Sequence, residues 1–230
     1  DQAISDGVLC PPVAYTIESA VNLDAVGIRG GEYEQSELSR AVRAPERTAA
    51  AFDAYAKYAA GLRTLGFAVD IGHATDTAEH FAGRGVPARV VHGKMRDDER
   101  HDALDWFRRE PGAVLINCQL IGEGVDIPGI ECVLILAPTR SATTMAQRIG
   151  RGSRLADGAN NLDESIALGK SCFIVLDVTD SVSDAGCRAV TVMDLFGAPE
   201  PTKRLAGENV MEVAKAQQAR LELGGVAELR

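Results

Sequence analysis

The segment QRIGRGSR holds the residues whose types and spacing could do chemistry. Gln147, Gly150, Arg151 and Arg154 occupy its first, fourth, fifth and eighth positions. Residues three apart lie on one face of a helix, so Arg151 and Arg154 are expected to point the same way. A planar guanidinium group matches the oxygens of a phosphate. The spacing therefore predicts a site that handles phosphate groups.

An acidic, glycine-containing loop, EGVDIP, precedes this segment and carries Gly124 and Asp126. It lies between two apolar runs, VLIN at 114–117 and CVLILAP at 132–138, whose composition is typical of parallel strands covered on both faces. Open α/β sheets bind ligands at the carboxyl ends of such strands. Gly124 would let the backbone approach a ligand closely. Asp126 either supplies a carboxylate to that ligand or simply caps a turn.

Predicted strands and helices alternate between residues 45 and 180. The expected helices span 45–63, 74–85 and 97–110, and the expected strands span 67–72, 88–93, 114–117, 132–138 and 171–180. The second helix is expected to take Thr75 or Asp76 as its N-cap. The polar segment 155–170 is expected to be a loop. This alternation predicts a parallel sheet with right-handed crossovers.

The two ends of the chain have a different character. Residues 1–44 show no sustained periodicity and are interpreted as a connector that contains one strand and one short acidic helix. Residues 181–230 include an alanine-rich helical pattern at 208–223 and are too few for a core of their own. They are therefore expected to form an extension that packs on the domain at 45–180.

Composition limits the possible functions. The chain has 230 residues, of which 46% are hydrophobic and 25% charged, as in a globular protein with a sizeable core. A net charge of −9 argues against a protein that coats nucleic acid, although one face can still be basic. The five cysteines and four histidines show no metal-ligand spacing, so no metal site is predicted and a reducing, cytoplasmic location is expected. No signal peptide or membrane-spanning run is recognisable.

Three segments carry a resemblance to a known family. QRIGRGSR fits the motif Q-x-x-G-R-x-x-R, called motif VI, in full; VLINCQLIGEGVDIP fits motif V; and FAVDIGHATDTAEHF is similar to motif IV. With these motifs the chain resembles the second RecA-like domain of superfamily-2 helicases and translocases of the DEAD/DEAH kind. It is most similar to the branch of type III restriction translocase subunits and branched-DNA helicases. The resemblance implies an α/β fold: a RecA-like parallel sheet flanked by helices, with a small helical C-terminal extension.

The sequence lacks two motifs that the family carries in its first lobe. It has no G-x-x-x-x-G-K-[ST] phosphate loop and no D-E-x-H or D-E-x-D box. The resemblance therefore implies that residues 1–44 lead from a missing first lobe, which would hold most of the contacts to ATP and Mg²⁺. The chain also begins without Met, as a piece of a longer polypeptide would. We expect the chain alone to be inactive.

The resemblance implies a role for each residue of the predicted phosphate site. Arg151 and Arg154 would be catalytic arginine fingers that reach the γ-phosphate of ATP. The implied ATP-binding residues are Gly124, Asp126, Gln147, Gly150, Arg151 and Arg154. Without the motif, the two arginines would only stabilise the C-terminus of a helix. Gln147 would contact the nucleotide or nucleic acid, or would order the cleft through hydrogen bonds.

The resemblance also implies a nucleic-acid groove on the loops that follow the strands. Its implied residues are Gly93, Lys94, Cys118, Thr139, Arg140 and Ser141. Cys118 stands where many relatives carry a Thr, and because a thiol donates poorly, the neighbouring backbone N–H groups could serve instead. Lys and Arg at such positions are otherwise ordinary solvated surface charges. DNA is favoured over RNA as the partner, together with the first lobe, and no membrane is expected.

The predicted function is the C-terminal motor lobe of an ATP-dependent helicase or translocase that nucleic acid stimulates. The alternative is a non-catalytic binding or adaptor module that keeps the fold and uses the cleft for a protein partner. The intact Q-x-x-G-R-x-x-R motif argues against it, because an adaptor needs neither arginine. A dinucleotide enzyme is disfavoured since no G-x-G-x-x-G turn follows a strand.

Overall fold

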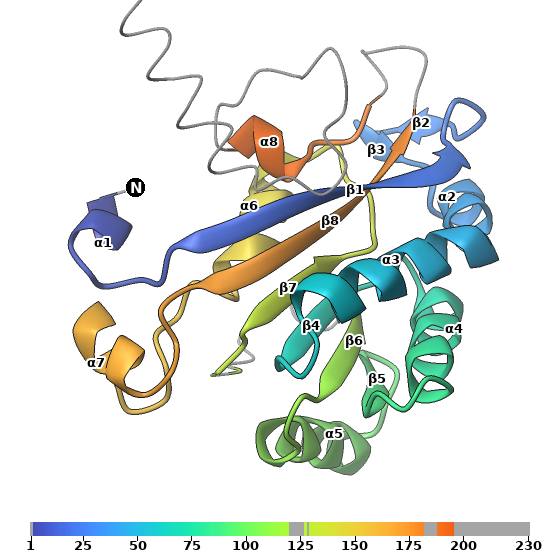
Figure 1. The fold of residues 1–230 in the computed structure, drawn as a ribbon. Coiled ribbons are helices and arrows are strands. Elements are labelled where there is room, and N and C mark those ends of the chain that lie inside the picture. Colours follow the sequence, from blue (N-terminus) through green and yellow to red (C-terminus); the bar gives the residue numbers. More distant parts are fainter. Residues whose placement is uncertain (1, 120–126, 128, 182–187, 196–230) are drawn as a thin grey trace, which may run out of the picture.

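A single six-stranded parallel sheet forms the centre of the molecule (Figure 1). The computed structural model describes residues 2–119, 127, 129–181 and 188–195. The sheet has the strand order β1-β8-β7-β4-β6-β5. Its strands are β1 (Pro12–Asn22), β4 (Thr64–Phe67), β5 (Ala88–His92), β6 (Val114–Cys118), β7 (Cys132–Ile135) and β8 (Phe173–Ser181). The parallel sheet predicted from the sequence is confirmed.

Helices cover both faces of this sheet (Figure 1). One face packs against α3 (Pro45–Tyr58) and α4 (Ile71–Ala82). The other face packs against α5 (Asp97–Arg109), α6 (Ala142–Gly150) and α8 (Val192–Leu195). The other described helices are α1 (Gln2–Ser5), α2 (Gln35–Val42) and α7 (Leu162–Ala167). The arrangement has the three layers expected of a RecA-like lobe.

The central strands are buried on both sides, as their apolar runs predict. All five residues of β6 are buried. Leu115 joins the cluster under α5 and α6, whereas Val114 and Ile116 join the cluster under α3 and α4, because successive side chains of a strand point to opposite faces. Burying each such side chain contributes about 1.5–3 kcal/mol. These strands therefore fix the sheet to which the loops are attached.

The first predicted strand and the helix after it were placed too late in the sequence. The strand was expected at 67–72, but β4 spans Thr64–Phe67 and pairs with β6 and β7. Asp70, not Thr75 or Asp76, is the N-cap of α4, and its carboxylate accepts a hydrogen bond of 2.7 Å from the backbone N–H of His73. A carboxylate that satisfies a free N–H begins the helix there.

The strand and the short acidic helix expected within 1–44 are confirmed as β1 and α2, and β1 pairs along its length with β8 at the edge of the sheet. One further segment differs from its prediction. The segment 155–170, predicted as a loop, contains α7, which begins where the Asn161 side chain accepts from the N–H of Glu164 at 2.9 Å. The predicted helix at 208–223 lies outside the described residues. The domain boundaries at 45 and 181 stay predictions.

A small hairpin stands beside the carboxyl ends of the strands. Its strands are β2 (Ile28–Arg29) and β3 (Glu32–Tyr33), and it turns through Gly30 and Gly31. Both glycines have positive φ, a conformation that other residues adopt only with strain. Tyr33 packs with α2 and the end of β1 in a third apolar cluster.

Candidate nucleotide and nucleic-acid site

The two arginines of the predicted phosphate site lie at and beyond the C-terminus of α6. The helix begins at its N-cap Ser141, whose hydroxyl accepts from the N–H of Thr144 at 3.1 Å, and it ends at Gly150. Arg151 is the C-cap, and Arg154 follows in non-helical chain. The expectation that both arginines lie on one helix face is therefore wrong for Arg154. Both side chains are half-buried.

Contacts from three other segments fix the backbone that carries these arginines. The N–H of Cys10 donates to the carbonyl of Ser153 at 2.7 Å. The ammonium of Lys170 donates to the carbonyl of Gly152 at 3.0 Å and also to that of Arg154. A Cβ atom at Gly152 would collide with the ring of Phe173, so only glycine allows this close approach. The arginine-bearing turn, residues 151–154, is thus held by its backbone.

Lys170 is a functional candidate that the sequence did not reveal. Its side chain is buried, with only 5% of the residue exposed. Burial lowers the pKa of its ammonium from the usual 10.5. A buried charge is costly unless it is hydrogen-bonded, and here the acceptors are backbone carbonyls. Since backbone acceptors leave no trace in the sequence, no residue pattern could have indicated this contact.

The arginine-bearing turn lies at the amino ends of β1 and β8. Cys10, which binds Ser153, stands just before β1, and Phe173, which packs on Gly152, is the first residue of β8. The loops predicted to contact nucleic acid instead follow the carboxyl ends of the strands. The helix α6 runs from one region to the other. Gly124 and Asp126, predicted to face the arginines, lie outside the described residues.

The carboxyl-edge loops expose some of the predicted nucleic-acid residues and bury others. Gly93 and Lys94, directly after β5, are exposed. Cys118 is only 2% exposed, and its thiol lies 4.0 Å from the carbonyl oxygen of Val69, its acceptor. Burial raises the pKa of this thiol. In this structure Cys118 therefore offers neither a thiolate nor an accessible hydrogen-bond donor, as its weak chemistry suggested.

Glu32 of the hairpin engages the loop after β7. Its carboxylate accepts from the hydroxyl of Thr139 at 2.8 Å and from the N–H of Arg140 at 3.0 Å. The guanidinium of Arg140 donates to the carbonyl of Gly31 at 3.2 Å. Thr139 is 3% exposed, and Ser141 uses its hydroxyl to cap α6. Of this predicted trio, only the Arg140 and Ser141 side chains are partly open to solvent.

A cavity of about 400 Å³ lies between the hairpin and α6. Gln147 lines it, and so does Arg148, for which the sequence pattern predicted no role in the site. The guanidinium of Arg148 donates to the carbonyl of Ala137 at 2.5 Å and lies 5.7 Å from the centre of the Phe67 ring. Burial lowers the pKa of this guanidinium. Gly150 lies two residues further on and is exposed.

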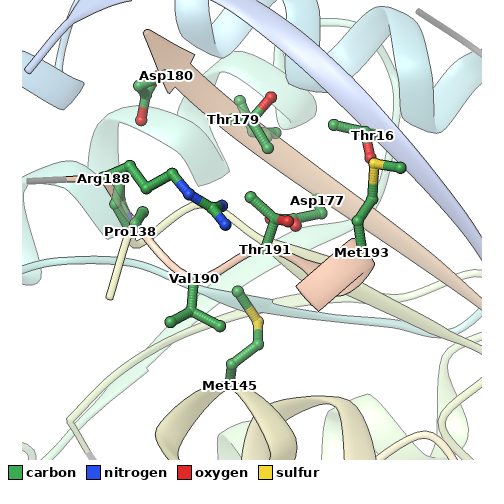
Figure 2. Close-up of a pocket in the computed structure, with 12 residues that line it drawn as sticks. Thr16, Pro138, Met145, Asp177, Thr179, Asp180, Arg188, Val190, Thr191 and Met193 are labelled. Carbon is green, nitrogen blue, oxygen red and sulfur yellow. The ribbon is translucent and has the colours of Figure 1, made fainter. Parts of the chain in front are cut away.

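A second cavity, of about 110 Å³, lies between β8, β1 and the segment before α8 (Figure 2). Asp177 faces it, is 2% exposed, and accepts from the N–H of Val192 at 2.8 Å. Burial raises the pKa of Asp177 to about 7. Arg188, which also lines the cavity, is paired with Asp194 at 2.6 Å. This volume holds only a few water molecules, so it cannot take a nucleotide.

The fold and the Q-x-x-G-R-x-x-R turn resemble those of a helicase C-terminal domain, and comparisons with known proteins agree with this resemblance. Residues 51–156 match the family described as the helicase conserved C-terminal domain. The C-terminal domain of the DEAD-box protein Dbp5 superposes with a TM-score of 0.51 at 16% identity, over 94% of this chain and 99% of that one. The fragment of an HsdR subunit, provisionally assigned, of a type I restriction enzyme from Vibrio vulnificus gives 0.55 at 22% identity, over 82% and 39%.

Two relatives are similar to this chain in amino-acid sequence. The provisionally named mitochondrial ATP-dependent helicase irc3 of Schizosaccharomyces pombe is 32% identical over 119 residues, which cover 52% of this chain and 18% of that protein. UvrABC system protein B of Cyanothece is 35% identical over 104 residues, covering 41% and 16%. This chain thus spans less than a fifth of the length of either relative. Its residues 51–156 are therefore similar to the C-terminal domain of superfamily-2 helicases, in agreement with the resemblance of its motifs.

No described helix is long and apolar enough to cross a membrane. In the same part of the chain, no three His, Cys, Asp or Glu side chains lie close enough to hold a metal ion. The cytoplasmic location and the ATP-binding residues stay predictions.

Proposed function

We propose that this chain is the C-terminal motor lobe of an ATP-dependent helicase or translocase that nucleic acid stimulates. The observation that carries the proposal is the arginine-bearing turn. Its backbone is fixed by Cys10, Lys170 and Phe173, while the side chains of Arg151 and Arg154 keep partial access to solvent. A turn held in this way can present guanidinium groups to a ligand bound on another lobe.

Arg151 and Arg154 act as arginine fingers in this proposal. In phosphoryl transfer, charge spreads over the oxygens of the transferred group, and an arginine there raises the rate by about 10³ to 10⁵. Gln147 and Gly150 lie in the last turn of α6, just before the two arginines, and complete the set of described residues proposed to meet ATP. Mg²⁺, bound with ATP on the first lobe, would offset further phosphate charge. This chain supplies positive charge and neither the phosphate loop nor the metal ligands.

The carboxyl-edge loops are the proposed contact with nucleic acid. Lys94 is exposed after β5, and Arg140 lies across the same edge after β7. Both can neutralise phosphates of a strand that runs along the edge, despite the negative charge of the whole chain. DNA is the proposed partner. Cytoplasmic activity, as part of a longer polypeptide, completes the proposal.

The first test uses the chain alone and then the chain joined to a phosphate-loop lobe. The chain alone should hydrolyse no ATP above background, with or without DNA. In the joined protein, Arg151→Ala should lower kcat about 10³-fold or more and leave DNA affinity unchanged, because the arginine acts only on the transferring phosphate. Steady-state phosphate release and DNA-binding titrations measure the two quantities.

A matched control is Arg89→Ala, since Arg89 is an exposed arginine that lies over Trp106, far from the turn in the chain. It should leave kcat unchanged. DNA-stimulated hydrolysis by the chain alone, or full activity in the Arg151→Ala protein, would contradict the proposal. Absence of hydrolysis by the joined protein, together with binding of a protein partner, would favour the adaptor function instead.

A further inference from the structure

Of the described residues that line the cavity between the hairpin and α6, only Gln147 takes part in the proposed ATP chemistry. It opens at the carboxyl ends of three central strands, where Phe67, Asn117 and Ala137 line it. Its volume of about 400 Å³ falls within the roughly 300–1,000 Å³ of sites that bind small ligands. The cavity is therefore large enough for one flat organic group.

Carboxamide side chains dominate the polar lining of this cavity. Four of the described lining residues are amides: Gln35, Asn117, Gln119 and Gln147. Each amide carries both donors and an acceptor. Asn117 is 3% exposed, so this amide is part of the cavity floor and not of the surface. Asn and Gln are the side chains that pair with the edge of adenine, and amides can serve other bases in the same way.

The two charged residues of the lining are committed to other contacts. The carboxylate of Glu32 already accepts from Thr139 and Arg140. The guanidinium of Arg148 donates to the carbonyl of Ala137 and lies over the ring of Phe67. A guanidinium held in this way offers a flat face on which a base can stack. The lining therefore suits a neutral, planar ligand with hydrogen-bonding edges.

The position of the cavity favours a base from a nucleic-acid strand over the base of a free nucleotide. Thr139 lines the cavity, and Arg140 is the next residue in the chain. The phosphates of a strand bound at Arg140 would therefore pass the opening of the cavity. Lys94 follows β5 on the same edge of the sheet, with β4 and β6 between β5 and β7. A base that turns away from its phosphates at this point would face the amides. The arginine-bearing turn, by contrast, lies at the amino ends of β1 and β8.

We propose that this cavity receives one unstacked base of the bound strand, which the amides of Gln35, Asn117 and Gln147 hydrogen-bond and the guanidinium of Arg148 stacks against. The inference rests on the proposed function, because it needs a strand on the carboxyl edge. It adds that the lobe holds a base as well as the phosphates. A lobe that contacts only the backbone would need no such cavity.

The test compares two single-stranded DNA oligonucleotides of equal length, one of mixed sequence and one with abasic sites throughout its central part. Anisotropy titrations with the full chain should give about tenfold weaker binding of the abasic strand, the loss expected when one stacked and hydrogen-bonded base is removed. The double variant Gln35→Ala/Gln147→Ala should weaken binding of the mixed-sequence strand several-fold and leave the abasic strand unaffected. Both positions are exposed, so the variant should fold, which a thermal melt checks.

Lys94→Ala is the matched comparison. It removes a proposed phosphate contact, so it should weaken both strands by the same factor and reduce the salt dependence of both. Equal affinity of the wild-type chain for the two strands would overturn the cavity assignment and leave the proposed function intact. Absence of binding to either strand would overturn both. A Gln35→Ala variant that weakens binding of free ATP but not of the strand would assign the cavity to a free nucleotide and overturn the inference.

Discussion

The positively charged side chain of Lys170 is almost completely buried in the described fold. Its ammonium contacts the carbonyls of Gly152 and Arg154, which both belong to the arginine-bearing turn. The carbonyls of non-helical chain have no helical N–H partners, so an ammonium with three donors can satisfy more than one of them. At the scale of single residues, the position of the arginine-bearing turn thus depends on a lysine that lies outside the motif.

Replacing Lys170 by Met tests this contact. Lys170→Met keeps most of the apolar stem and leaves the two carbonyls without a donor, so the free energy of unfolding should fall by about 1–3 kcal/mol. Urea denaturation followed by circular dichroism measures the change. Lys57→Met is the control, because Lys57 is exposed on α3 and should matter little. Equal stability of the Lys170→Met and wild-type proteins would refute the role.

The sequence alone did not report which of the predicted site residues are accessible. It singled out Lys94, which is exposed, but it placed Arg151 and Arg154 on one helix face, whereas Arg154 lies beyond the end of α6. It could not show that Thr139 is buried and bound to Glu32, since those two residues are 107 positions apart. Contacts of that length depend on the topology of the sheet, which local patterns do not encode.

At the scale of elements, a buried ion pair joins α3 to the last strand. The guanidinium of Arg47 lies 2.8 Å from the carboxylate of Asp180, with side-chain exposures of 1% and 0%. Ser19 of β1 also contacts this carboxylate, and Arg47 reaches the carbonyl of Val178 at 3.3 Å. The pair therefore fixes α3 against β8 and β1. That contact binds the edge strand β1 to the rest of the lobe.

Breaking one side of this pair should be costly. Asp180→Asn leaves the Arg47 charge buried without its counter-ion, so the free energy of unfolding should fall by about 3–5 kcal/mol. Denaturant titration gives the value. The matched control is Asp76→Asn, because the Arg43–Asp76 pair has side-chain exposures of 44% and 46% and should contribute less than about 1 kcal/mol. Similar losses in the two variants would mean that burial of the Arg47–Asp180 pair does not matter.

The elements themselves were largely predictable, and their ends were not. Apolar runs located β5, β6, β7 and β8 because buried parallel strands need such runs. The start of α4 was missed because the Asp70 carboxylate, which caps it, lies within the segment expected to be a strand. The helix α7 was missed because six residues between polar turns show no clear period. Capping and short helices depend on single contacts, which periodicity does not report.

At the scale of the whole molecule, a buried carboxylate under the segment before α8 makes stability depend on pH. Burial raises the pKa of Asp177 to about 7 from its usual 3.8. Asp180, Arg47, Asp194 and Arg188 are the charged groups around it. Because the folded state binds this proton more tightly than the unfolded chain, the contribution is fully present below pH 3.8 and is lost as pH rises through 7.

This dependence should disappear when Asp177 is replaced by Asn. Wild-type stability should fall relative to Asp177→Asn by about 1.4 kcal/mol for each pH unit between the two pKa values, as an upper bound. Urea denaturation of both proteins at pH 5, 6, 7 and 8 gives the difference at each pH. The difference isolates Asp177, since the other titrating groups are common to both proteins. A difference that stays constant across this range would contradict the raised pKa.

The helix α6 spans the distance between the two regions to which we assign function. It starts at Ser141, beside the Thr139–Arg140 loop that Glu32 binds, and after nine helical residues it delivers Arg151. At 1.5 Å per residue, this is a rod of about 14 Å. Met145 and Ile149 pack this helix against the sheet, so it is held along one face. Under the proposed function, a displacement of the loop at one end of α6 would therefore shift Arg151 at the other end directly, as a lever does, without a relay of side chains.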